Sequence, residues 1–154
     1  MGQSIFVPKE VDVTEGRVAV SPETVKRLAG LGFDIVVEKN AGEQSRIVDS
    51  EFEKAGAKIG KASDASKADV VLKLRRPTPA EVKTYKKGAL VLASMDPYGN
   101  EGDVAAMAAA GVTAFAMEFM PRITRAQSMD VLSSQSNLAG YKAVLDAAAV
   151  YGSA

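Results

Sequence analysis

Short runs of β-branched and aliphatic residues alternate along the chain with segments whose apolar positions recur every three or four residues. The first pattern is typical of buried strands, the second of amphipathic helices. The strand-like runs are Ile5–Pro8, Asp34–Glu38, Ala57–Ile59, Asp69–Leu74, Ala89–Ser94 and Val112–Met117. Since helical segments separate most of them, the pattern predicts an α/β fold with an open, mostly parallel sheet of the flavodoxin-like or Rossmann-like type.

The helical segments carry start and stop residues. Ser21 and Pro22 provide an N-cap and a first turn for a helix that Gly32 ends. Further helices are predicted over Asp49–Ala55, from Thr78 to about Lys86, and over Gly102–Ala110. The pair Gly30 and Gly32 follows a helix and lacks a third glycine at the required spacing, so we interpret it as a helix end and not as a dinucleotide-binding turn.

After Met120 the alternation stops. A helix beginning at Ser128 or Asp130 is predicted to continue to Val150, a length of about 30 Å. We therefore divide the chain into a first α/β subdomain, residues 1–128, and a connecting helix, residues 129–154. That helix is expected to lead to a dinucleotide-binding subdomain that the sequence lacks, either because a longer polypeptide has been cut or because another chain completes it.

Composition narrows the classes of function. With 47% hydrophobic residues the 154-residue chain can bury a core, and its 19 basic and 19 acidic residues provide no excess charge for nucleic acid. The absence of cysteine and histidine excludes thiolate catalysis and the usual metal ligand, so no metal site is expected. No secretory signal or membrane-spanning stretch is recognisable, which predicts a cytoplasmic protein.

Residues 121–142 form the most polar segment. Within it Arg122, Gln127, Asp130 and Ser133 supply a cation, an amide, a carboxylate and a hydroxyl, and the last two share one helix face. Two interpretations are open for this segment. It is either an ordinary N-capped helix start with local ion pairs, or a binding wall for a polar ring that carries an amide, such as nicotinamide.

Two cations elsewhere are further candidates. Arg17 lies in the loop after the first strand, and Lys73 lies near the end of the strand Asp69–Leu74, where an open parallel sheet holds its ligands. Lys73 is predicted either to bind an anionic substrate or to be a solvated, charged side chain at the surface. The pair Arg75-Arg76 is interpreted as a solvated turn.

Residues 121–142 resemble, almost position for position, the signature of the NAD(H)-binding component of proton-translocating nicotinamide nucleotide transhydrogenase. Three other stretches are similar to the same family, namely Phe6–Glu10, Arg17–Pro22, and Asp69–Lys73 with Arg76-Pro77. The opening patterns are shared with alanine dehydrogenases, whereas the 121–142 run is specific to the transhydrogenase.

The resemblance implies a cleft between two subdomains that binds NAD(H). The site residues that it implies are Arg122, Gln127, Ser128, Met129, Asp130 and Ser133, at the nicotinamide end. It further implies hydride transfer from NADH to NADP⁺ held on a partner component, coupled to proton translocation through a transmembrane component. The expected assembly is a homodimer, peripheral on the cytoplasmic or matrix face of an energy-transducing membrane and not inserted in it.

Two alternatives are open. An alanine-dehydrogenase-like oxidoreductase is disfavoured because that family uses a histidine as acid and base, and here the neighbourhood is Ser94–Tyr98. Arg17 and Lys73 match substrate-binding positions of that relative and are expected to be structural or inherited here. A non-catalytic assembly module is favoured if the natural chain ends at residue 154. On the main hypothesis, this fragment alone is expected to be inactive.

Overall fold

The computed structural model describes residues 2–152. The chain folds into two compact units, Met1–Ala116 and Met117–Ala154. All six strands belong to the first unit, and the long helix belongs to the second.

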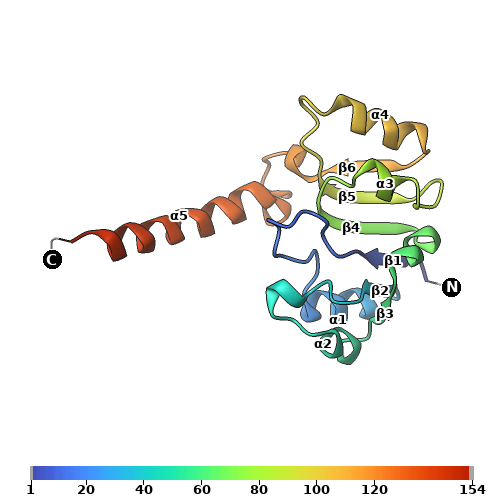
Figure 1. Cartoon of the computed structure of the whole chain (residues 1–154), viewed down its shortest axis with the longest axis horizontal. Coiled ribbons are helices and arrows are strands. Elements are labelled where there is room, and N and C mark those ends of the chain that lie inside the picture. Colours follow the sequence, from blue (N-terminus) through green and yellow to red (C-terminus); the bar gives the residue numbers. More distant parts are fainter. Residues whose placement is uncertain (1, 153–154) are drawn as a thin grey trace. The chain divides into compact units, whose positions relative to one another are not determined.

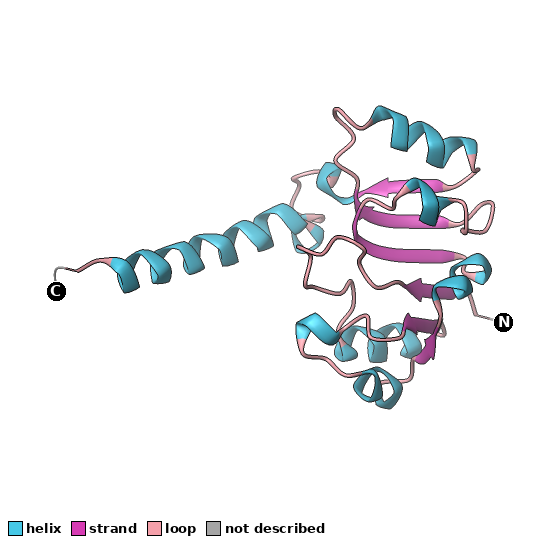
Figure 2. Cartoon of the chain, in the orientation of Figure 1, coloured by secondary structure: helices cyan, strands magenta, loops and turns pink. Residues whose placement is uncertain are grey.

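The first unit is built on an open sheet of six parallel strands (Figures 1 and 2). The strands are β1 Ser4–Val7, β2 Asp34–Glu38, β3 Lys58–Gly60, β4 Val70–Arg75, β5 Leu90–Ser94 and β6 Thr113–Ala116. This confirms the predicted α/β fold with an open parallel sheet. The order β3-β2-β1-β4-β5-β6 is that of Rossmann-type folds and not the flavodoxin order, and it reverses direction between β1 and β4.

Helices cover both faces of this sheet. They are α1 Pro22–Gly30, α2 Asp49–Lys54, α3 Pro79–Val82 and α4 Glu101–Ala109, with the 3₁₀ segments η1 Glu43–Ser45 and η2 Ala62–Lys67. Alternate β1 residues point to opposite faces, because Val7 packs with Val25 of α1 and Phe52 of α2, whereas Phe6 packs with Val82 of α3 and Met107 of α4. Two apolar clusters therefore form, one on each face.

Most predicted elements are confirmed to within two residues, but α3 is shorter than predicted. It ends at Val82 and not near Lys86. Thr78 and Glu81 form the capping box that starts the helix, and the Thr84 hydroxyl then donates to the carbonyl of Glu81. A threonine hydroxyl that binds a nearby carbonyl competes with helix continuation, which explains the single turn.

Two glycines allow a matched test of packing. A Cβ at Gly60 would lie 2.4 Å from Cγ1 of Val36 and 2.9 Å from Oδ2 of Asp64, whereas a Cβ at Gly30 meets nothing within 4 Å. We expect Gly60→Ala to lower the free energy of unfolding by about 1–3 kcal/mol through overpacking. Gly30→Ala should leave it unchanged or raise it by up to about 1 kcal/mol. Urea denaturation measures the free energy of unfolding of both variants. Equal changes in the two variants would contradict the close packing around Gly60 of β3.

The second unit contains η3 Met117–Phe119, η4 Gln127–Met129 and the twenty-residue helix α5 Val131–Val150. Asp130 is the N-cap of α5, and no residue of this helix is buried. Gly140 and a run of alanines give it many small side chains. Within residues 2–152, no helix combines the length and the hydropathy that crossing a bilayer requires.

Candidate functional site

Four of the six predicted site residues line one pocket of about 320 Å³ in the second unit. Arg122, Gln127, Asp130 and Ser133 meet there, together with Ile123 and Thr124. Ser128 and Met129 lie in η4, next to Gln127 in the chain, and are not among the lining residues. The structure thus brings the cation, the amide, the carboxylate and the hydroxyl to a common surface.

Asp130 organises this surface as the N-cap of α5. Its Oδ1 accepts the N–H groups of Leu132 at 3.0 Å and Ser133 at 3.2 Å, and its Oδ2 accepts the Ser133 hydroxyl at 2.6 Å. These hydrogen bonds, those from Ser133 first, together with the charge of Arg122 lower the pKa of Asp130 below its ordinary value. The carboxylate is therefore ionised near neutral pH.

The cap determines which groups remain for a ligand. The Ser133 hydroxyl donates to Asp130, so Ser133 can offer a ligand only its oxygen lone pairs. Within residues 2–152 the structure records no side-chain hydrogen bond or ion pair for Arg122 or Gln127, and both are exposed. A carboxylate already occupies the helix N-terminus, which disfavours a phosphate there and leaves donors for an uncharged polar group.

Removing the cap should loosen the first turn of α5. We expect Asp130→Ala to cost about 0.5–2 kcal/mol of local stability, whereas Asp130→Asn keeps an accepting oxygen and costs less. Hydrogen exchange at the Leu132 and Ser133 amides measures this effect. Since the pKa of Asp130 is lowered on folding, the charged cap is present at neutral pH and is lost as the pH falls through that lowered value. Unchanged exchange in Asp130→Ala would contradict the capping geometry.

Lys73 is not surface charge, so the solvated interpretation was wrong. It lies within β4, its side chain is fully buried, and its ammonium group is 2.5 Å from Oε1 of Glu81 and 3.5 Å from Oε2 of Glu10. The other Glu10 oxygen accepts the Leu74 N–H at 2.7 Å. Both neighbouring carboxylates already compensate this cation, so it has no free charge for an anionic substrate.

Arg17 and Arg75 also have defined hydrogen-bond partners. Glu15 is almost fully buried and accepts two hydrogen bonds from the Arg17 guanidinium at 2.7 Å and one from Arg75 at 3.1 Å. The side-chain hydrogen bond from Arg17 lowers the pKa of Glu15. Arg17 and Arg75 are thus joined through one carboxylate.

Arg76 does not lie in a solvated turn, contrary to the prediction. Its guanidinium donates to Asp103 at 3.0 Å and to the carbonyls of Met95 at 2.5 Å and Asp96 at 2.9 Å. It therefore ties the end of β4 to the loop after β5 and to α4. No local sequence signal indicates these partners, because only the pairing of strands in the sheet brings them together.

Comparisons with known proteins agree with this architecture. Residues 6–139 match the family model described as alanine dehydrogenase/PNT, N-terminal domain. The chain is 50% identical over 151 residues to the first portion of the NAD(P) transhydrogenase subunit alpha of Rhodospirillum rubrum, an alignment that covers 94% of this chain and 39% of the relative. It is 33% identical over 141 residues to alanine dehydrogenase 1 of Staphylococcus aureus, which covers 92% of this chain and 37% of the relative.

A solved structure extends the likeness to three dimensions. The transhydrogenase from Sinorhizobium meliloti superimposes with a TM-score of 0.95 at 63% identity, over 99% of this chain and 46% of that one. The chain therefore spans less than half the length of these relatives. On the match to the family model and on these identities, the chain belongs to the alanine dehydrogenase/PNT N-terminal domain family, as the counterpart of the N-terminal domain of transhydrogenase alpha subunits.

Proposed function

We propose that this chain is the first subdomain of the NAD(H)-binding component of a proton-translocating transhydrogenase. The observation that carries the proposal is the pocket that Arg122, Gln127, Asp130 and Ser133 line together, within the segment that resembles the transhydrogenase signature. In this proposal residues 1–128 form the subdomain, and residues 129–154 lead to a second subdomain with the glycine-rich turn.

The donor set suits the amide-bearing ring of a nicotinamide. Arg122 and Gln127 offer donors, while Gln127, Asp130 and Ser133 offer acceptors. A bound nicotinamide cofactor supplies the reactive carbon and the hydride, so the protein's task is to position the ring. The Asp130 cap fixes Ser133 and the start of α5, and Ser128 and Met129 belong to the same loop. No side chain has to remove a proton from the ring, which fits a chain without histidine.

The remaining components of the reaction lie outside this chain. The proposed partners are an NADP(H)-binding component, which accepts the hydride on NADP⁺, and a transmembrane component that couples the transfer to proton movement. The name of the R. rubrum relative describes it as one portion of an alpha subunit, which is consistent with a component divided among polypeptides. We further propose a homodimer on the cytoplasmic or matrix face of the membrane.

Titration with NADH tests whether binding requires the second subdomain. We expect the 154-residue chain to bind NADH weakly or not at all and to be inactive alone, because no glycine-rich turn is present to hold the pyrophosphate. The complete polypeptide should bind NADH at micromolar concentration and, with its partners, reduce NADP⁺. Isothermal titration calorimetry compares the two proteins. Micromolar binding by the short chain would refute the assignment of the phosphates to a second subdomain.

An alanine-dehydrogenase-like activity is the second candidate, favoured by the 33% identity to the S. aureus enzyme. Two observations weigh against it. The chain has no histidine, and both Glu10 and Glu81 compensate the charge of Lys73. Oxidation of NADH by the complete protein in the presence of pyruvate and ammonia, without NADP⁺, would favour this candidate over the transhydrogenase.

A further inference from the structure

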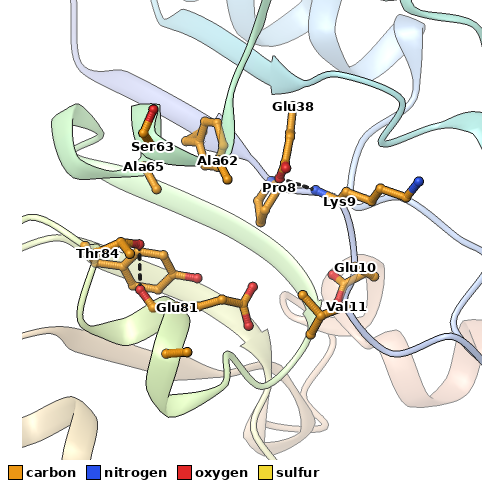
Figure 3. A pocket seen from close by; sticks show the side chains of 13 residues that line it. Pro8, Lys9, Glu10, Val11, Glu38, Ala62, Ser63, Ala65, Glu81 and Thr84 are labelled. Atoms are coloured by element: carbon orange, nitrogen blue, oxygen red, sulfur yellow. Dashed lines mark hydrogen bonds between the residues drawn. The ribbon is translucent and has the colours of Figure 1, made fainter.

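A larger pocket, of about 510 Å³, lies in the first unit and shares no lining residue with the candidate nicotinamide pocket. Its walls are the residues that follow β1, the segment η2 and residues 80–85 around α3 (Figure 3). The strand order reverses between β1 and β4, and ligands of open α/β sheets bind outside the carboxyl ends of the strands at that reversal. The pocket therefore occupies the place where this fold holds a ligand.

The lining combines an apolar surface with an excess of negative charge. Phe6, Pro8, Val11, Ala65, Ala80 and Tyr85 provide most of its apolar groups. Three carboxylates, those of Glu10, Glu38 and Glu81, belong to the same lining. Lys9 also belongs to the lining and pairs with Glu43, while the single ammonium of Lys73 contacts both Glu10 and Glu81 and the charge of Arg17 also acts on Glu10. The three lining carboxylates thus outnumber the single lining ammonium.

Two lining groups have unused hydrogen-bonding capacity. Oε2 of Glu10 and the hydroxyl of Tyr85 are buried and have no hydrogen-bond partner among residues 2–152. The Glu10 side chain is only 2% exposed. Burial, reinforced by the charges of Glu81 and Glu10, raises the pKa of Tyr85, so its hydroxyl remains protonated. Buried polar atoms without partners are rare in folded proteins.

Phosphates and other anions do not suit this pocket. Where a Rossmann fold has a glycine-rich turn after its first strand, this chain has Pro8, Lys9 and Glu10. The Lys9 N–H donates to Glu38 at 2.9 Å, and the Leu74 N–H donates to Glu10. Carboxylates of the protein therefore occupy the backbone donors that an anion would need.

We propose that this pocket binds a small organic cation, a protonated amine carried on a flat apolar body. The ammonium group compensates the excess negative charge of the lining and donates to Oε2 of Glu10 and to the hydroxyl oxygen of Tyr85, neither of which accepts a hydrogen bond within residues 2–152. The apolar body packs against Pro8 and the Tyr85 ring, which also attracts a cation through its π face. This proposal does not depend on the proposed transhydrogenase function.

Three probes with the same indole ring test the role of charge: tryptamine, which is cationic, tryptophol, which is neutral, and indole-3-acetate, which is anionic. They are titrated into the ¹⁵N-labelled chain at pH 7 and followed by two-dimensional NMR. We expect tryptamine to shift amides of Val11, Ser63 and Thr84 with a dissociation constant in the millimolar range, as suits a ligand of this size. Tryptophol should bind at least about fivefold more weakly, and indole-3-acetate should give no saturable shift.

Variants locate the site. Ala80→Phe, at an exposed lining position, should fill the pocket and abolish the tryptamine shifts, whereas Ala108→Phe, at an exposed position of α4 outside the lining, should leave them unchanged. Glu10→Gln should remove the preference for tryptamine over tryptophol. If that variant does not fold, the less buried Glu38→Gln should reduce the preference. The proposal is overturned if tryptamine gives no saturable shift, if the anion binds as tightly, or if Ala80→Phe binds like the unaltered chain.

Discussion

Replacing Lys73 with alanine is expected to lower the free energy of unfolding of the first unit by about 3–5 kcal/mol. The substitution leaves Glu10 and Glu81 facing each other without a cation, with side chains only 2% and 17% exposed. Removing one partner of a buried ion pair is strongly destabilising because the remaining charge is uncompensated in a poorly solvated place. Urea denaturation followed by far-ultraviolet circular dichroism measures the change.

Two further variants test whether the loss of stability comes from the buried carboxylates left without a cation. Lys67→Ala removes an exposed ion pair with Asp64 and should cost less than about 1 kcal/mol. The triple variant Lys73→Met, Glu10→Gln, Glu81→Gln removes all three charges and should recover most of the stability that Lys73→Ala loses. If Lys73→Ala were no more damaging than Lys67→Ala, the cluster would not be desolvated as the structure has it.

The second large effect concerns Arg122 in the complete protein, which we propose to be a transhydrogenase component. On the proposed function, Arg122→Ala should reduce the rate of hydride transfer from NADH to NADP⁺ by about 10²-fold, because loss of a positioning contact displaces the ring from its reactive geometry. The dissociation constant for NADH should change much less, since the proposal assigns the phosphates to a second subdomain. Single-turnover kinetics and equilibrium binding measure the two quantities separately.

Arg125 provides the matched control for this experiment. It is an exposed arginine of the same loop but does not line the pocket. Arg125→Ala should retain near-normal rates. Similar small effects of both substitutions would remove Arg122 from the proposed site, and similar large effects would indicate a general requirement for positive charge in the loop.

The strands could be predicted from sequence because parallel strands, covered on both faces, appear as continuous apolar runs. Val71 and Val91 are such residues and are fully buried at the centre of the sheet. The helix caps at Ser21 and Thr78 could also be predicted from the sequence, because a cap depends on residues only a few positions away. Local signals of this kind located the strands and the α-helices, apart from the end of α3, but not the short 3₁₀ segments.

The partners of Lys73 could not be predicted in this way. Glu10 lies in the loop after β1, and only the pairing of β1 with β4 brings it to the lysine. Glu81 was visible as a capping residue, but nothing local indicates that its second oxygen binds a buried ammonium. The pocket around Arg122 differs, because its residues are close in the chain and the turn of η4 gathers them. The role of that pocket in binding nicotinamide stays a prediction.

The exposed helix α5 has a consequence for how the protein melts. None of its twenty residues is buried, so its order depends mainly on its own backbone hydrogen bonds and on the Asp130 cap. The helicity of an isolated helix falls gradually with temperature as its ends fray, whereas a sheet with two apolar clusters unfolds cooperatively. Calorimetry should therefore record one sharp heat-absorption peak on a sloping baseline, and a single melting temperature would describe only residues 1–116.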